Sequence, residues 1–310
     1  MLQRRILRIK AFKVLFSFAE NPELSLKEAL ATFDRSCQAT RDEYLFMLSL
    51  IPAVTSHASR LIEAARGKFN PTEEDLNPNL RFVNNRVSRI LCEDPDFGRI
   101  TEKRKISWEN CDAFISALYN TVSTRGYFAE YMASGEESLM ADAHLWQEIF
   151  RNELEDNEDL AAILEEKSIW WPDELGYVLG VCIRALSQIA STGRWELPPL
   201  FQSEILASEG KKADSDSDFV HRLISATMGR YEEYSKLIAS NVSKWDLDRL
   251  YTTDTVLISM GLAEARTFPE IPVKVTINEY VEISKYYSTP RSRGFVNGLL
   301  DKLIKAEGLL

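Results

Sequence analysis

The sequence predicts an all-α protein, and three observations support this fold class. Apolar residues recur at the i, i+3, i+4, i+7 spacing that lines one face of a helix in most of the long segments. Several of these segments, such as residues 3–18, contain neither Gly nor Pro. A helix-start signal, in which Thr276 is followed three positions later by Glu279, occurs where one of the C-terminal periodic segments begins.

The N-terminal part of the chain predicts three helices. Residues 3–18 form the first, and because apolar side chains surround most of its circumference beyond Ile6, we expect it inside a helical bundle. Asn21 and Pro22 end this helix, and residues 25–33 form a short second one. Residues 40–66 read as a long amphipathic helix in which Pro52 can introduce a kink.

The middle of the chain is less regular at first and then helical. Residues 70–79 and 93–98 have the Pro, Gly, Asn and Asp content of loops, whereas residues 108–190 are mostly helical. The clearest helices there are residues 111–124, 143–154 and 175–189. Trp170 and Trp171 interrupt the pattern, and their acidic surroundings favour core or interface packing over stacking on RNA bases. Residues 193–218, charged and poor in apolar side chains, predict a linker.

The C-terminal part predicts four helices. Residues 219–238 form one and residues 247–265 another. Thr276 and Glu279 form a capping box that predicts a helix start at Thr276, and residues 288–290 separate this helix from the last one. The final helix carries a broad apolar stripe of Phe295, Val296, Leu299, Leu300, Leu303 and Ile304.

The composition of the chain limits the classes of protein to which it can belong. With 310 residues, of which 45% are hydrophobic, the chain can bury a substantial core. It lacks an apolar run of the length needed to span a bilayer and its start lacks the features of a secretory signal, so we expect a cytoplasmic protein without a membrane partner. The four cysteines are far apart, which predicts free thiols rather than disulfides or a zinc site.

No arrangement of residues predicts catalysis. His57, His144 and His221 each fall on a predicted helix without a paired nucleophile, and the chain has no Gly-rich phosphate-binding loop. The run 214–218 is similar to a calcium loop but has Phe219 and Ser225 where that loop needs Gly and a carboxylate. We therefore expect no enzyme activity, no metal and no cofactor.

The charges are distributed unevenly along a chain of net charge −10. Residues 1–19 hold five basic and no acidic side chains, and residues 284–305 hold five basic side chains and one acidic, whereas residues 135–175 hold thirteen acidic and two basic. Arg4, Arg5 and Arg8 lie near the positive end of a helix dipole, where an anion is favoured. From spacing alone, an anionic ligand and simple solvation of these arginines are equally good interpretations.

Two motifs resemble those of the NusB family of transcription antitermination factors. The C-terminal motif consists of Pro272, Lys274-Val275, Ile277-Asn278-Glu279, Phe295-Val296-Asn297-Gly298 and Leu300-Asp301-Lys302. The N-terminal motif, Arg4-Arg5, Arg8, Ala11 and Leu15-Phe16, is similar to the arginine-rich first helix of that family. The resemblance covers about residues 1–40 and 215–310, and the residues between them are additional.

The resemblance implies a NusB-like helical bundle enlarged by an additional helical region. We expect an N-terminal arginine-rich region at residues 1–40 and a helical insertion at 41–213, acidic in its middle and ending in a linker. A C-terminal NusB-like bundle would occupy residues 214–310.

The implied function is binding of single-stranded boxA-like leader RNA together with ribosomal protein S10, within an RNA polymerase antitermination complex. Arg4, Arg5 and Arg8 would hold phosphates, with Lys10 and Lys13 as weaker candidates. Arg291 and Arg293 would extend this surface, and Phe295 would stack on or support a base, although its apolar neighbours also suit a core position. Phe16 stands where the family has Tyr, which removes a hydroxyl but keeps a ring for stacking. Ser259 replaces a basic residue of many relatives, so a contact made by that residue does not carry over.

Two other functions remain open from the sequence. The chain can be a helical protein–protein interaction scaffold that kept the fold without RNA binding. Convergence of the five predicted arginines on one face would discriminate this scaffold from the RNA-binding function. The RNA-binding domain of an RNA methyltransferase is disfavoured, because only eight residues follow Lys302.

Overall fold

The computed structural model describes residues 1–201, 216–242 and 250–309, and regular structure in these ranges is helical apart from one isolated bridge between Leu2 and Phe201. This confirms the all-α fold class. The elements, in chain order, are α1 (Arg4–Glu20), α2 (Leu26–Arg66), α3 (Glu73–Leu76), α4 (Arg86–Glu93), α5 (Pro95–Arg104), α6 (Asp112–Ser123), α7 (Gly126–Ala133), α8 (Leu139–Asn152), α9 (Glu158–Lys167), the 3₁₀ helix η1 (Pro172–Glu174), α10 (Leu175–Thr192), α12 (Asp216–Gly229), α13 (Tyr231–Asn241), α15 (Thr252–Thr267), α16 (Val273–Tyr287) and α17 (Ser292–Ala306).

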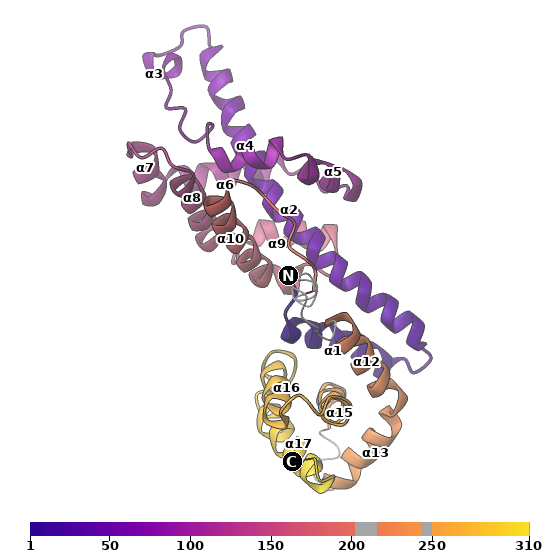
Figure 1. Cartoon of the computed structure of the whole chain (residues 1–310). Helices are drawn as coiled ribbons and strands as arrows, with labels where there is room; N and C mark the ends of the chain where they lie inside the picture. Colours follow the sequence, from indigo (N-terminus) through magenta and orange to yellow (C-terminus); the bar gives the residue numbers. More distant parts are fainter. Residues whose placement is uncertain (202–215, 243–249, 310) are drawn as a thin grey trace. The chain divides into compact units, whose positions relative to one another are not determined.

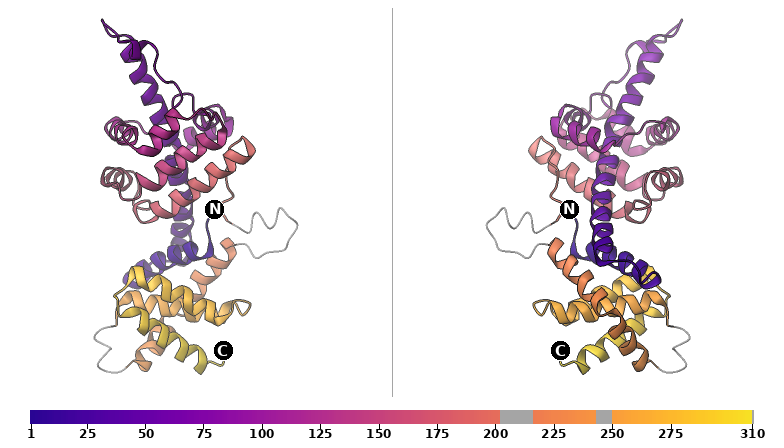
Figure 2. Two further views of the ribbon diagram at one scale, coloured as in Figure 1. Left: turned by 90° about the vertical axis from the view of Figure 1, so that its left-hand side faces the viewer. Right: turned by 90° about the vertical axis from the view of Figure 1, so that its right-hand side faces the viewer.

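The chain forms two compact units (Figures 1 and 2). Unit 1 consists of residues 1–37 and 199–310, and unit 2 consists of residues 38–198. The division falls inside α2, so unit 1 is built from the two ends of the sequence. Most of the predicted linker, residues 202–215, lies outside the described residues.

In unit 1 the helix α15 occupies the centre, and α12, α13, α16 and α17 surround it (Figure 1). The helix α1 also contacts α15 and α12. Apolar side chains cover α15 on all sides, which requires burial all round, and its residues from Asp254 to Ala265 are buried. A side-chain Cβ on Gly261 would lie 2.6 Å from a methyl carbon of Leu300, so glycine allows α17 to approach α15 closely.

The start of α16 differs from the sequence prediction. The helix begins at Val273 after Pro272, and no side chain caps it. Thr276 lies inside the helix, and its hydroxyl donates to the buried carboxylate of Glu264, while Glu279 accepts hydrogen bonds from Arg5. The capping box is therefore wrong, because both of its side chains bond to neighbouring helices instead of to the first turn.

Two predicted helix boundaries are also wrong. The segments 25–33 and 40–66 form one helix, α2, since residues 34–39 contain neither Gly nor Pro to interrupt it. Conversely, the single helix predicted for residues 219–238 is two helices, α12 and α13, separated at Gly229 and Arg230. Glycine has a low helix propensity and readily ends a helix there.

Unit 2 is a separate helical bundle in which α8 packs along α10, and α4 and α7 contact α8. Its part of α2 contributes a buried run that includes Tyr44 and Phe46. The ring of Phe46 stacks on Trp108 at 4.0 Å between centroids and lies 5.2 Å from Trp171. Trp171 is buried, and its indole N–H donates to the Ala39 carbonyl, so the predicted core role is confirmed for this residue. Trp170 is half-buried.

Two helices, α2 and the segment from Pro172 to Thr192, are long and apolar enough by composition to cross a membrane. About half of each apolar window is buried inside the protein, and core helices of globular proteins meet the same criterion. All four cysteines are free thiols; Cys92 is exposed and the others are buried.

Candidate functional site

The arginines of α1 lie in unit 1 against three other helices, and Arg8 is the most deeply buried of them. Its guanidinium donates two hydrogen bonds, of 2.7 and 2.8 Å, to the carboxylate of Glu264 on α15. The side chains are 4% and 0% exposed. Burial acts to lower the pKa of Arg8, but the bonds to Glu264 outweigh it and hold that pKa above its ordinary value. Arg8 is therefore fully engaged inside the protein.

Arg5 and Arg4 are more exposed but also form ion pairs. Arg5 donates two hydrogen bonds, of 2.7 and 2.9 Å, to Glu279 on α16. The hydrogen bonds from Arg5 lower the pKa of Glu279, and Arg8 adds a smaller contribution. Arg4 lies 3.1 Å from Asp216 on α12 and 4.8 Å over the ring of Phe219. Each of the three arginines thus has a carboxylate partner in unit 1.

The remaining predicted residues of α1 divide into one buried and two half-buried side chains. Lys10 is 2% exposed, and its ammonium group donates to the carbonyl of Ser36. Lys13 lies 5.7 Å from the ring centre of Tyr287 at the end of α16. Phe16 is half-buried, with its ring 6.2 Å from that of Phe12. Lys13 and Phe16 are thus accessible in part, whereas Lys10 is inside.

At the start of α17, Arg291 and Arg293 are exposed and Phe295 is half-buried. Arg291 and Phe295 line a cavity of about 470 Å³ in unit 1, together with Tyr251, Asp254, Thr289, Pro290 and Ser292. This volume is within the usual range for ligand pockets. The ring of Phe295 thus borders an open cavity instead of filling the core.

Charges from the two ends of the chain meet around α16. The pKa of Glu282 is lowered first by its hydrogen bond with Lys285, and further by the positive charges of Arg5 and Arg293. Both arginines therefore lie within electrostatic range of one carboxylate. The aromatic rings join the same ends, because Phe12 on α1 lies 5.4 Å from Tyr287.

Sequence reasoning missed two buried carboxylates that organise this region. Glu264 accepts the bonds from Arg8 and also from the hydroxyls of Thr276 and Tyr280, at 2.9 and 2.8 Å. Asp254 is 3% exposed, and its carboxylate accepts hydrogen bonds from the hydroxyls of Ser288 and Ser292, at 2.6 and 2.8 Å. It lines the same cavity as Arg291. The signal available in the sequence was an acidic residue near each end of an otherwise apolar helix. Carboxylates buried in such a helix need hydrogen-bonding or charged partners.

Ser259 is not at the surface of unit 1. It lies fully buried within α15, and its hydroxyl has no hydrogen-bond partner among the described residues. Ser259 is therefore not accessible to a ligand at the surface.

Comparison with known proteins identifies the family. The model of the NusB family matches residues 181–305. Over 125 residues, the chain is 33% identical to the transcription antitermination protein NusB of Myxococcus xanthus, and the match covers 40% of this chain and 89% of that protein. The NusB of Bacillus mycoides is 33% identical over 121 residues, covering 39% of this chain and 89% of that protein. The chain belongs to the NusB family.

Other NusB proteins match over a shorter part of their length. The NusB of Salinibacter ruber is 38% identical over 90 residues, which is 29% of this chain and 56% of that protein. No solved structure matches the chain. The region matched by the NusB family model begins within α10 and does not include α1. At 310 residues, the chain is longer than these NusB proteins, consistent with an enlarged form.

Proposed function

We propose that this protein is a transcription antitermination factor that binds single-stranded boxA-like leader RNA together with ribosomal protein S10, in the cytoplasm, within an RNA polymerase antitermination complex. The observation that carries the proposal is the ion pair of Arg5 with Glu279 on α16, three residues before Glu282, whose carboxylate lies within electrostatic range of both Arg5 and Arg293. The relatives named above are transcription antitermination proteins by name.

The predicted residues differ in exposure, and this difference determines the role that we propose for each. Arg291 and Arg293, both exposed, hold phosphates, and Arg5 contributes from its position beside Glu279. Phe295 borders a cavity in which an unstacked base can lie against its ring. Phe16 and Lys13 extend the surface along α1. Arg8 and Lys10 support it from inside, and Arg4 is held by Asp216.

A second function is favoured by one observation. Arg4, Arg5 and Arg8 all have carboxylate partners, so the N-terminal positive charge is largely compensated within unit 1. A helical scaffold that binds proteins and no RNA would not need uncompensated positive charge on this helix.

Fluorescence anisotropy of a labelled boxA-like RNA, with and without S10 and at two salt concentrations, tests the proposal. The informative variant is Arg291→Ala/Arg293→Ala, because both side chains are exposed and neither guanidinium has a hydrogen-bond partner among the described residues. Lys236→Ala on α13, whose side chain is 75% exposed, is the matched control. We expect the wild type to bind in a salt-sensitive manner and S10 to strengthen this binding. The double variant should bind roughly tenfold or more weakly, and the control should bind like the wild type. Absence of binding by the wild type with S10 present would favour the scaffold.

A further inference from the structure

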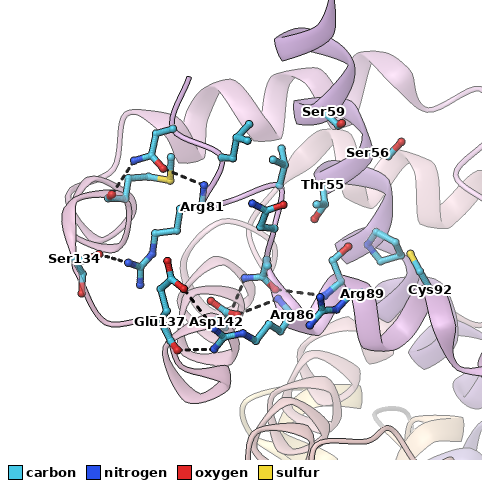
Figure 3. A pocket seen from close by; sticks show the side chains of 18 residues that line it. Thr55, Ser56, Ser59, Arg81, Arg86, Arg89, Cys92, Ser134, Glu137 and Asp142 are labelled. Carbon is cyan, nitrogen blue, oxygen red and sulfur yellow. Dashed lines mark hydrogen bonds and ion pairs between the residues drawn. The ribbon is translucent and has the colours of Figure 1, made fainter. Parts of the chain in front are cut away.

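Unit 2 contains a cavity of about 880 Å³ that the proposed function does not use (Figure 3). Its walls come from α2, from the segment that leads into α4, from α4 itself and from the segment between α7 and α8. Hydroxyl groups of Thr55, Ser56 and Ser59 line the side formed by α2. The size is that of a pocket for a small molecule.

Three arginines line this cavity, and two of them are fixed by backbone carbonyls. The guanidinium of Arg81 donates to the carbonyls of Ser134 and Glu136 and lies 4.3 Å over the ring of Tyr131. The guanidinium of Arg86 donates to the Glu137 carbonyl at 2.6 Å. Bonds to carbonyls hold the guanidinium groups in place without neutralising their charge, which preorganises a site for an anion.

The third arginine, Arg89, is exposed on α4, and the described residues provide no acceptor for its guanidinium. The five donors of this group are therefore available to a ligand. Arg89 lies on the same helix as Arg86, three positions further on, and both line the cavity.

The two acidic residues of the cavity do not cancel this charge. Asp142 is 6% exposed, and its carboxylate already accepts from the Tyr131 hydroxyl at 2.8 Å and from the backbone N–H of Arg86 at 3.0 Å. Glu137 forms an ion pair with Arg86 at 3.8 Å, but its side chain is 82% exposed, so water weakens this pairing. A positive excess therefore remains at the wall formed by the arginines.

The charge of the whole unit favours a small anion over a polymer. Residues 38–198 contain 16 basic and 27 acidic side chains. A long RNA would meet this negative field along its length, whereas a small anion inside the cavity meets mainly the nearby arginines, because salt screens charges beyond about 8–10 Å.

We propose that this cavity binds a small phosphorylated molecule of the size of a nucleoside monophosphate. Arg86 and Arg89 hold the phosphate by charge-assisted hydrogen bonds, and Arg81 adds its fixed positive charge. The hydroxyls of α2 bind polar groups of the ligand, and Leu80 and Met132 provide an apolar wall for the remainder.

Cys92 provides a direct reporter of binding, because it lines the cavity and is the exposed one of the four cysteines. The test measures the rate at which a disulfide reagent modifies Cys92 in the full-length protein. The pH is mildly alkaline, because the cavity wall removes part of the water around this thiol and raises its pKa. The probes are the four common nucleoside monophosphates, ribose 5-phosphate, inorganic phosphate, a short oligoribonucleotide and an acidic peptide. Titration calorimetry on the same samples detects binding that leaves Cys92 accessible.

We expect at least one phosphorylated small molecule to bind saturably and to slow the modification of Cys92, and inorganic phosphate to bind more weakly. Arg89→Ala should weaken this binding about tenfold, since it removes a charged donor. Arg99→Ala, an exposed arginine on α5 outside the cavity, is the matched control and should leave it unchanged.

Three results would overturn the proposal. The first is neither protection nor heat with any phosphorylated small molecule at millimolar concentration. The second is equal binding by the wild type and the Arg89→Ala variant. The third is stronger protection of Cys92 by the oligoribonucleotide or the acidic peptide than by every small probe, which would assign the cavity to a macromolecule.

Discussion

Glu264 has no exposed surface, and its two oxygens accept four hydrogen bonds from Arg8, Thr276 and Tyr280. A buried carboxylate is tolerated only when its charge is paired and its lone pairs are satisfied. These bonds connect α15 to both α1 and α16. Burial and the neighbouring Glu264 charge also raise the pKa of Tyr280, so its hydroxyl remains a donor at neutral pH.

Replacing Arg8 should therefore destabilise the protein more than replacing an exposed arginine would. Arg8→Ala leaves the charge of Glu264 buried without its main partner, and breaking such a pair costs about 3–5 kcal/mol. Chemical denaturation followed by circular dichroism measures this loss. Lys236→Ala, which removes an exposed cation of the same unit, should change the free energy of unfolding by less than about 0.5 kcal/mol. A similar small loss for both variants would contradict the structural role of Arg8.

At the scale of the helices, the close approach of α15 and α17 depends on Gly261. We expect Gly261→Ala to lower the free energy of unfolding by about 1–3 kcal/mol, because its added methyl group would overlap Leu300. Gly298→Ala on α17 is the matched control: nothing lies within 4 Å of its added methyl group, so the higher helix propensity of Ala should raise stability by up to about 1 kcal/mol. Thermal unfolding of the two variants should shift in opposite directions.

These two glycines also show what a sequence motif leaves undecided. Gly298 belongs to the NusB-like motif, yet it is exposed, and a Cβ added there would have no atom within 4 Å. Gly261 lies outside the motif and is the glycine that allows α17 to approach α15 closely. The sequence pattern identifies a small residue, but only the position of the opposing Leu300 decides which glycine a helix needs.

The helices themselves were predictable where local signals determine them. Asn21 and Pro22 end α1 as expected, and the apolar periodicity predicts α10 and α17 closely. The candidate site was predictable in part. Arg5 and Arg293 could be identified from charge patterning, whereas the partner of Arg8 could not, because Glu264 lies 256 positions away along the chain. Ion pairs over such separations are set by the tertiary fold.

The pair of Arg5 and Glu279 connects α1 to α16 and should make stability depend on pH. The lowered pKa of Glu279 means that its stabilising effect is fully present above the ordinary glutamate pKa of about 4.3 and is lost as pH falls below it. We expect the wild type to exceed Glu279→Gln by about 0.5–1 kcal/mol at pH 7, a modest value because Arg5 is half exposed. Urea unfolding at neutral and acidic pH measures the difference, which should vanish in acid. A difference that grows in acid would have the wrong sign.

At the scale of the whole molecule, the charges are divided between the two units. Unit 2 carries 16 basic and 27 acidic side chains, and the remaining 21 basic and 20 acidic side chains belong to unit 1. Arg4, Arg5 and Arg8 are already paired within unit 1, so these three arginines should release few counterions from RNA. The dependence of the proposed RNA binding on salt should therefore be shallower than unpaired arginines at these positions would give.

The salt dependence of RNA affinity follows from this division of charge. Each phosphate contact on single-stranded RNA contributes about −0.7 to the slope of log affinity against log salt. Removing Arg291 and Arg293 together should therefore make the slope shallower by about 1.4 if each holds one phosphate. Lys236→Ala, at an exposed position of α13, should leave the slope unchanged. Anisotropy titrations at four or more salt concentrations give both slopes. If the double variant bound more weakly with the same slope as the wild type, these arginines would act by shaping the surface and not by contacting phosphates.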